Sequence, residues 1–283
     1  MPALFVFMWS TGFIGAKYGL PDAGPMTFLG LRFLIVIAGL GLAALVFRAP
    51  WPRGRQILHA AIVGLLLHAV YLGGVFSSID AGVDAAVSAL IVGIQPILTG
   101  LVSGPVLGER VTPRQWFGLA LGLVGVALVV WIKLDDGGTA GGMAFSFLAL
   151  LGVTAGTIWQ KRFCGTLDIR TSGVVQFVAA SVPILMLAVF VERWDVVYTR
   201  DFLFAVTWLV IVLSFGAITL LALLLRRGSA SRTASLFYLV PASTAVLAWL
   251  LFDEEFGPLT VLGMGVAMAG VAIVNRAPAP IGR

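Results

Sequence analysis

The segment QPILTGLVSGPVLGERVTP (95–113) is followed about 145 residues later by VPASTAVLAWLLFDEEFGP (240–258). Four residues recur unchanged at this offset: Pro96 and Pro241, Thr99 and Thr244, Glu109 and Glu254, Pro113 and Pro258. The same offset relates Gly118 to Gly263 and the run GVA at 125–127 to GVA at 270–272, and it relates the cation Lys17 to Arg162. A repeat that extends along the whole chain predicts two copies of one structural unit.

Composition places the chain in the membrane. Of its 283 residues, 60% are hydrophobic and only 11% are charged, against about 25% charged in a soluble domain. The net charge of +5 does not indicate a nucleic-acid partner, because the basic residues lie in short loops between apolar segments. Cys164 is the single cysteine, so no intrachain disulfide forms.

The apolar segments predict an all-α membrane protein with ten transmembrane helices, because each is close to the roughly 20 residues that cross a bilayer. The expected limits are 3–20, 26–47, 57–78, 83–106, 114–133, 142–163, 171–191, 203–226, 230–252 and 258–275.

The distribution of Lys and Arg predicts that both termini are cytoplasmic in a multi-pass protein of the cell membrane. With the N-terminus inside, 13 of the 18 basic residues lie on the cytoplasmic side. The other side keeps five: Lys17, Arg32, Lys133, Arg193 and Arg200. Such an excess is the positive-inside pattern.

The repeat divides the chain into a first five-helix unit at 1–135 and a second at 136–283. Because five is odd, the two units enter the membrane in opposite orientations. The loop with Glu109 then faces the cytoplasm, and the loop with Glu254 faces outward. Inverted repeats around a central cavity are a common construction of secondary transporters.

These features are accompanied by local motifs. They are WSTGF at 9–13, KYGL at 17–20, FLGLRF at 28–33, the Pro96–Thr99 stretch, GER at 108–110 and the GVA near the end of each repeat. With them the chain resembles the drug/metabolite transporter superfamily, specifically EamA-type ten-helix exporters, which include aromatic amino-acid exporters of the YddG type. The resemblance implies a cavity lined by helices 1, 3, 4, 6, 8 and 9, with helices 5 and 10 as a supporting scaffold.

Polar residues at mid-depth are the candidates for a substrate site. His68 and Tyr71 share one face of the third helix, where a buried polar ring either lines the cavity or bonds a neighbouring helix. Ser88, Gln95, Thr99 and Ser103 form one stripe on the fourth helix, which indicates either a cavity wall or interhelical hydrogen bonds. Pro96 and Pro241 remove backbone hydrogen bonds and predict hinges.

Aromatic residues inside the segments are further candidates. Trp9 and Trp159 lie in the first helix of each repeat and face either the cavity or the surrounding lipid and protein. The remaining candidate substrate-binding residues are Tyr238, Ser10, Gln160 and Thr244, with Ser214 a weaker one.

Cations near the ends of the helices have two interpretations. Lys17 and Arg32 either extend to the headgroups or, for Lys17, attract a carboxylate, with Arg162 as its counterpart at the opposite mouth. Small residues at Gly118 and Gly122 on helix 5, and at Gly265 and Ala269 on helix 10, predict close packing between helices of the scaffold.

All 13 carboxylates lie in loops or at segment ends. This disfavours ion-coupled carriers that use a mid-membrane carboxylate, and intramembrane aspartyl proteases. We therefore expect no enzyme, no catalytic residue, no metal and no cofactor. The sequence predicts a monomeric, facilitative exporter of small metabolites, with amino acids, aromatic ones included, as the expected substrates. Exchange of sugars, nucleotide sugars or phosphorylated metabolites, and proton-coupled drug export through His68, remain alternatives.

Overall fold

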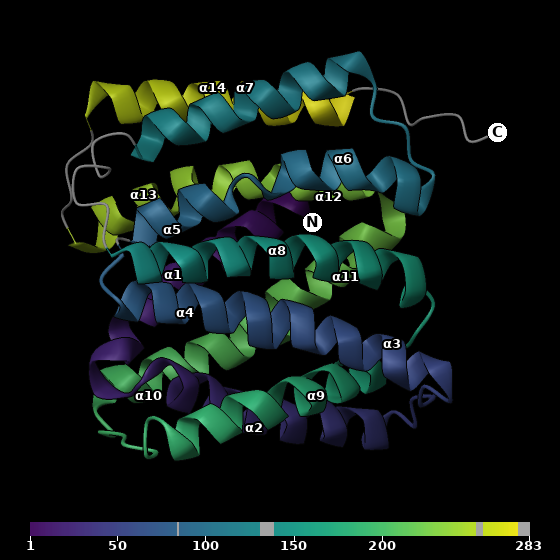
Figure 1. The fold of residues 1–283 in the computed structure, drawn as a ribbon, viewed down its shortest axis with the longest axis vertical. Helices are drawn as coiled ribbons and strands as arrows, with labels where there is room; N and C mark the ends of the chain where they lie inside the picture. Colours follow the sequence, from purple (N-terminus) through teal and green to yellow (C-terminus); the bar gives the residue numbers. More distant parts are fainter. Residues whose placement is uncertain (84, 131–138, 253–256, 277–283) are drawn as a thin grey trace.

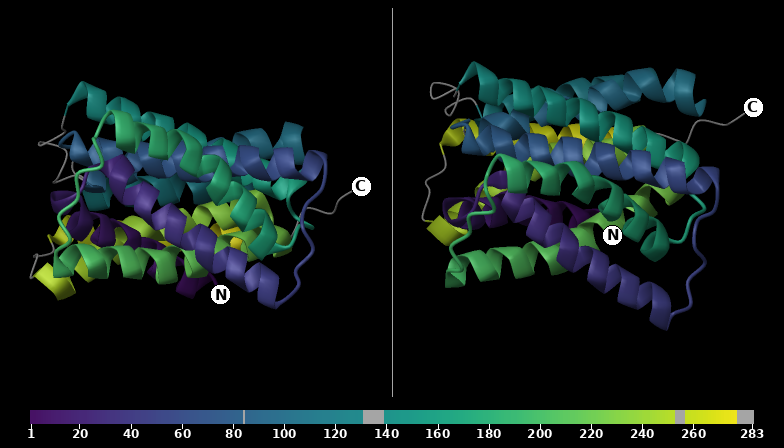
Figure 2. Two further views of the ribbon diagram at one scale, coloured as in Figure 1. Left: turned by 90° about the horizontal axis from the view of Figure 1, so that it is seen from below. Right: turned by 60° about the horizontal axis from the view of Figure 1, so that its bottom comes forward.

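The computed structural model describes residues 1–83, 85–130, 139–252 and 257–276. The described residues are almost entirely helical, and their one β-bridge joins Ala23 to Val196. The helix axes lie side by side and are roughly aligned, so the loops collect at two ends of the molecule (Figures 1 and 2).

The helices fall into ten consecutive runs, which match the predicted segments to within three residues at the described ends. The first repeat contains α1 (Pro2–Gly19), α2 (Pro25–Val46), α3 with α4 (Arg55–Gly64, Tyr71–Asp80), α5 with α6 (Ala85–Val92, Gln95–Leu107) and α7 (Pro113–Val130). The second contains α8 (Ala140–Phe163), α9 (Ile169–Phe190), α10 with α11 (Arg200–Trp208, Ile218–Arg227), α12 with α13 (Ala230–Ser235, Leu239–Phe252) and α14 (Pro258–Arg276).

Seven of these runs are long and apolar enough to cross a membrane, judged by length and composition. Their outward faces carry large apolar side chains, such as Leu45, Phe190 and Val191, which are at least two-thirds exposed. A surface of this kind is suited to lipid tails rather than water.

Local sequence sets the helix ends. Pro25 and Pro258 begin helices at a position where the missing N–H is not needed. Hydroxyl and carboxylate caps begin others: Thr139 for α8, Asp168 for α9, Thr199 for α10 and Ser229 for α12. Arg170 hydrogen-bonds the Asp168 carboxyl and holds its pKa below the ordinary value. Gly108 ends α6 in the left-handed conformation.

The third run of each repeat is irregular at the same place. A π-helical segment, η2 (Leu65–Val70), joins α3 to α4, and another, η4 (Leu209–Ala217), joins α10 to α11. Such wide turns are rare and occur often at functional sites. Their recurrence at the repeat offset shows that they belong to the duplicated unit.

The fourth run of each repeat is interrupted just before its proline. The α-helix breaks at Gly93 and Ile94, immediately before Gln95 and Pro96. In the second repeat the 3₁₀ turn η5 (Leu236–Tyr238) precedes α13, whose third residue is Pro241. The breaks lie where the sequence predicts hinges; their movement stays a prediction.

Equivalent helices of the two repeats pack against each other. α7 packs along α14 at one edge of the bundle, and α2 packs along α9 at the opposite edge (Figure 1). Both pairs are antiparallel: Gly118 lies beside Val274 and Gly125 beside Ala267, while Gly30 lies beside Leu185 and Gly173 beside Leu40. This is the arrangement that inverted repeats produce. The boundary predicted at 135 and 136 lies outside the described residues.

The first helix of each repeat packs mainly among helices of the other repeat. α1 contacts α13, α10 and η4, whereas α8 contacts α3, α4, η2, α5 and α6. The two halves are therefore interlocked through the centre of the molecule, and any cavity between them is bounded by helices from both.

The close approach of α7 and α14 depends on glycine, though not on every residue that the sequence suggests. A Cβ at Gly118 or Gly125 would meet backbone atoms of α14. Gly265 and Ala269, in contrast, are exposed, so the close helix packing predicted for them is wrong. Ala267 and Gly270 occupy it instead, since helix rotation is not determined by a small-residue spacing alone.

Gly270→Leu tests this interface. An added Cβ would lie 2.5 Å from the Gly122 backbone nitrogen, so we expect overpacking to destabilise the protein by about 1–3 kcal/mol. Thermal denaturation in detergent measures the effect. Gly265→Leu is the matched control, because a Cβ there meets nothing within 4 Å. Equal melting temperatures for the two variants would contradict the assigned packing.

Candidate functional site

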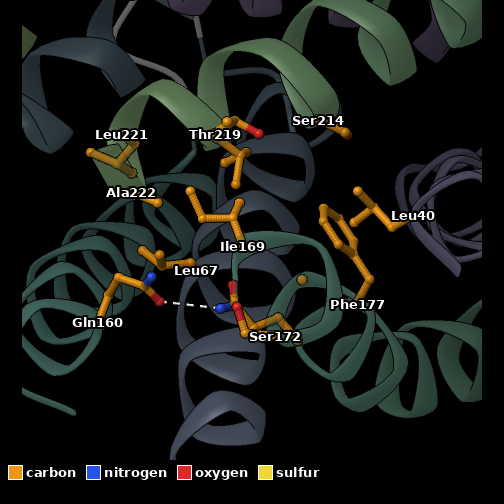
Figure 3. Close-up of a pocket in the computed structure, with 13 residues that line it drawn as sticks. Leu40, Leu67, Gln160, Ile169, Ser172, Phe177, Ser214, Thr219, Leu221 and Ala222 are labelled. Carbon is orange, nitrogen blue, oxygen red and sulfur yellow. Dashed lines mark hydrogen bonds between the residues drawn. The ribbon is translucent and has the colours of Figure 1, made fainter. Parts of the chain in front are cut away.

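A pocket lies between the two halves of the molecule (Figure 3). Its cavity volume is about 30 Å³ in this conformation, and the space around the cavity is partly open to solvent. Helices from both repeats line it, namely α2, η2, α8, α9, η4 and α11. The lining residues are Leu40, Leu67, Gln160, Ile169, Ser172, Gly173, Gln176, Phe177, Ser214, Ile218, Thr219, Leu221 and Ala222.

The walls of the pocket are apolar with a few placed polar groups, which is typical of small-molecule sites. The Gln176 side-chain nitrogen donates to the Gln160 side-chain oxygen at 3.1 Å, as the dashed line in Figure 3 shows. This bond links α9 to α8 across the pocket, and Gln160 is a residue that the sequence predicts for the site. Of the six helices that the resemblance implies around the cavity, helices 3, 6 and 8 line this pocket, whereas helices 1, 4 and 9 do not. Helices 2 and 7 line it as well.

Arg32 lies in the middle of the protein. Its side chain is fully buried, and its Nε donates to the Ser214 hydroxyl at 3.0 Å. Neither terminal guanidinium nitrogen has a hydrogen-bond partner. The interpretation that Arg32 extends to the headgroups is therefore wrong, because the side chain turns toward η4 instead of following its own helix outward.

His68 is also fully buried, on η2. Its ring stacks on Phe177 with centroids 4.0 Å apart and meets Phe33 edge-on at 6.2 Å. Neither ring nitrogen has a group in hydrogen-bonding geometry with it. Since Phe177 lines the pocket, His68 lies one layer behind the pocket wall.

Trp9 and Tyr71, two of the candidates from the sequence, contact each other. The Trp9 indole N–H donates to the Tyr71 hydroxyl at 3.3 Å, and the two rings stack with centroids 6.2 Å apart. Phe5 and Phe237 pack around Trp9. This aromatic cluster joins α1, α4 and η5, so it connects both repeats next to the buried polar groups.

The predicted stripe on the fourth run is fully buried and faces other helices. Ser88 accepts a hydrogen bond from Ser146 at 2.9 Å, and the Gln95 nitrogen donates to Thr157 at 3.4 Å. The Gln95 side-chain oxygen and the Thr99 hydroxyl have no partner. The contacts of Ser88 and Gln95 are interhelical hydrogen bonds to α8, while Gln95 and Thr99 retain unused hydrogen-bonding capacity.

Three other candidates lie where the ninth run meets α1 or α7. The Ser10 hydroxyl donates to the Val240 carbonyl at 3.3 Å, and the Thr244 hydroxyl donates to the Ser10 carbonyl at 3.4 Å. Tyr238 is fully buried against Gly122 of α7. None of these three lines the described pocket.

Trp159 belongs to a separate aromatic group on α8 and α3. It packs against Phe163 at 4.7 Å between centroids and against His59 at 5.8 Å. The Trp159 ring nitrogen is buried without a partner. The structure therefore separates Trp159 from Trp9, its companion in the sequence prediction.

The end of the molecule at which Glu109 meets α8 and α12 is held by charged groups, and we call it the Glu109 end. Lys161 pairs with Glu109 at 2.7 Å, and Glu109 also accepts from the Ala230 backbone nitrogen at 2.9 Å. Arg162 donates to the Val106 carbonyl. The first repeat is thus tied to the second here. The side chain of Lys17 and residue Glu254 lie outside the described residues.

A second set of ties holds the opposite end, which we call the Glu192 end. Glu192 accepts hydrogen bonds from the Thr27 backbone nitrogen and hydroxyl, both at 2.7 Å. The Thr199 hydroxyl donates to Asp22 at 2.5 Å. Both contacts again join the first repeat to the second, so each end of the pocket region carries its own inter-repeat contacts.

Sequence reasoning missed the grouping of Arg32 with Ser214 and of His68 with Phe177. The repeat itself contains a signal for it. At the repeat offset, Arg32 corresponds to Phe177, His68 to Leu213, and Ser214 to Ala69. These positions differ in chemistry between otherwise matched halves, and the structure brings them together behind and along the pocket wall.

An interlocked pair of inverted helical units around such a pocket is the architecture of a membrane carrier. The chain matches the EamA-like transporter family over residues 2–131 and again over 140–276. It belongs to that family. It is a membrane transporter of small metabolites and not an enzyme.

Several named relatives resemble the chain over nearly its whole length. The "Uncharacterized inner membrane transporter YedA" of Escherichia coli K12 is 30% identical, covering 96% of this chain and 88% of the relative. The "Probable amino-acid metabolite efflux pump" of the same organism is 25% identical over 95% and 92%. The "S-adenosylmethionine/S-adenosylhomocysteine transporter" of Chlamydia trachomatis serovar D is 26% identical over 96% and 86%.

A solved crystal structure of another protein superposes with a TM-score of 0.81 over 96% of this chain and 94% of that chain, at 19% identity. At this identity the likeness shows a shared fold.

Cys164 provides a native probe of the Glu109 end. It follows α8 directly, its side chain is buried, and burial raises the pKa of its thiol to about 11. A thiol of this kind reacts slowly with maleimide. Lys161 lies one helical turn before it, so breaking the Lys161–Glu109 pair by Glu109→Gln is expected to speed the labelling of Cys164 severalfold.

The labelling rate in membranes, followed by mass spectrometry, measures this effect. Asp201→Asn is the matched control, since it removes an acid from the first turn of α10, at the other end of the molecule. Equal rates in the two variants would show that the ion pair does not hold this end closed.

Proposed function

We propose that the chain is a facilitative exporter of amino acids and closely related zwitterionic metabolites in the cytoplasmic membrane. It works as a monomer by alternating access, with both termini in the cytoplasm. The observation that carries the proposal is the pocket between the two halves, bounded by the positions at which the repeats differ in chemistry.

Alternating access is supported by the contacts at the two ends. Each end has its own hydrogen bonds between the repeats, and the Glu109 end adds the Lys161 ion pair, so rocking of one half against the other breaks one set of contacts and keeps the other. The breaks before Pro96 and Pro241, and the π-helical segments, supply backbone that bends at matched places in both halves.

Export is supported by the position of the pocket. Gln160 lies near the end of α8, Ile169 begins α9, and Ala222 lies in α11, so the lining residues gather toward the Glu109 end. The positive-inside pattern places this end in the cytoplasm. A substrate would then enter from the cell interior.

The choice of amino acids rests on chemistry that two relatives share. One is named for amino-acid metabolites and the other for S-adenosylmethionine, which is itself an amino acid joined to a flat purine. The pocket offers Phe177 and nearby aromatic side chains for an apolar part. Its lining contains no Lys or Arg, which weighs against phosphorylated metabolites and nucleotide sugars, since several cations bind a polyphosphate best.

Counterflow in proteoliposomes containing the pure protein tests the proposal. Tryptophan, phenylalanine and methionine are expected to exchange, with net flux following the amino-acid gradient after a protonophore removes any pH gradient. Exchange of nucleotide sugars without amino acids would refute the substrate class. Strict dependence of net flux on a pH gradient would refute facilitation and favour a proton-coupled exporter.

Thr219→Trp tests whether this pocket is the transport route. Thr219 lines the pocket and is half-buried, so an indole there fills the space and is expected to abolish most of the exchange. Ile211→Trp is the matched control on η4, because Ile211 is 57% exposed toward the lipid side. Full exchange by Thr219→Trp would place the route elsewhere.

A further inference from the structure

Arg32 is a cation in the membrane core, and no carboxylate of the described residues forms an ion pair with it. It lies seven residues into α2, about 10 Å along the helix, and none of its side chain is exposed. Its Nε donates to Ser214, while both terminal nitrogens lack a partner. A guanidinium carries five N–H donors, so most of its hydrogen-bonding capacity is unused.

Such an arrangement is costly unless it has a use. Removing a charge from water costs several kcal/mol, and an isolated charge in hydrocarbon is tolerated where it pairs with another group or serves a transport path. The carboxylates of the described residues pair or lie at the ends of the helices, as Glu109 and Glu192 do. A ligand that carries a negative charge would supply the missing partner.

Ser214 connects Arg32 to the pocket. Its hydroxyl oxygen accepts the bond from Arg32, and the same residue forms part of the pocket wall (Figure 3). Because the oxygen accepts from Arg32, the Ser214 O–H is free to donate to a ligand. The guanidinium thus lies directly behind the wall of the proposed transport site.

We propose that Arg32 binds the carboxylate of the transported substrate, with Ser214 positioning the guanidinium and adding one donor. This inference rests on the proposed function and adds to it: substrates are recognised through a carboxylate. The planar fork of Arg matches two carboxylate oxygens. A single cation also matches the single charge of a carboxylate, whereas a phosphate dianion would remain half-compensated.

The terminal nitrogens are covered in the conformation of this structure. Contact with a carboxylate belongs to a conformation in which η4 separates from α2, and Ser214 lies on the π-helical segment where the backbone is irregular. The repeat equivalents of Arg32 and Ser214 are Phe177 and Ala69. The site is therefore single and asymmetric, with the aromatic ring of Phe177 available to the other end of the substrate.

Competition by matched analogues tests the inference. Tryptophan and tryptophanamide differ only in the carboxylate, and each is used to compete for tryptophan exchange in proteoliposomes. For the wild-type protein we expect tryptophan to compete at least about tenfold better, since losing a charge-assisted bidentate pair has an effect of that order. For Arg32→Gln we expect tryptophan to compete less well by a similar factor, and the preference for the acid over the amide to disappear.

Two further variants test the same inference if Arg32→Gln fails to fold. Arg32→Lys keeps the charge without the fork and is expected to retain part of the preference. Ser214→Ala is expected to weaken competition by tryptophan severalfold while keeping the preference for the acid over the amide. Ser181→Ala is the matched control, because this serine bonds only its own helix at Val178 and lies outside the pocket lining.

The outcomes separate the two proposals. If the wild-type protein exchanges no amino acid, the proposed function is wrong. If the wild-type protein exchanges amino acids but tryptophan and tryptophanamide compete equally well, the proposed role of Arg32 is wrong. It is also wrong if Arg32→Gln keeps the wild-type preference for the acid. If Arg32→Gln weakens acid and amide by the same factor, Arg32 supports the fold and does not bind the carboxylate.

Discussion

The antiparallel packing of equivalent helices is the constraint on which the rest of this structure depends. α2 packs against α9, and α7 against α14, each helix meeting its own counterpart from the other repeat. At α7 and α14 the contact is close enough that Gly118, Gly125 and Gly270 have no room for a side chain. The α7–α14 pair supports an edge of the bundle, and the α2–α9 pair borders the pocket. Rotation of one half against the other must therefore take place at the contacts between these helix pairs.

A duplicated unit begins with two equal copies of every position, so one asymmetric site requires the copies to diverge. In the centre of the molecule the copies differ in chemistry, since Arg32 corresponds to Phe177, His68 to Leu213 and Ser214 to Ala69. Elsewhere the copies keep the same construction, including the π-helical segments and the break before each proline. In the proposed mechanism, the shared parts serve movement and the differing parts serve recognition.

The helices were predictable because a bilayer allows few alternatives: an apolar run of about 20 residues must satisfy its own backbone hydrogen bonds. Side-chain partners were less predictable. Position along α2 suggested that Arg32 reaches the headgroups, but helix rotation and the presence of Ser214 on η4 decided otherwise. Likewise, depth made Ser10 and Tyr238 candidates for a cavity, whereas the structure packs them against neighbouring helices. Sequence spacing gives depth and face within one helix and does not identify the facing helix.

The binding of substrate by Arg32 is best tested by an experimental structure with bound tryptophan. We predict the ligand between the two halves, with its carboxylate about 2.7–2.9 Å from the terminal nitrogens of Arg32 and its ring near Phe177. A ligand bound elsewhere, with Arg32 satisfied by protein groups or extended to the headgroups, would show that Arg32 does not bind the substrate.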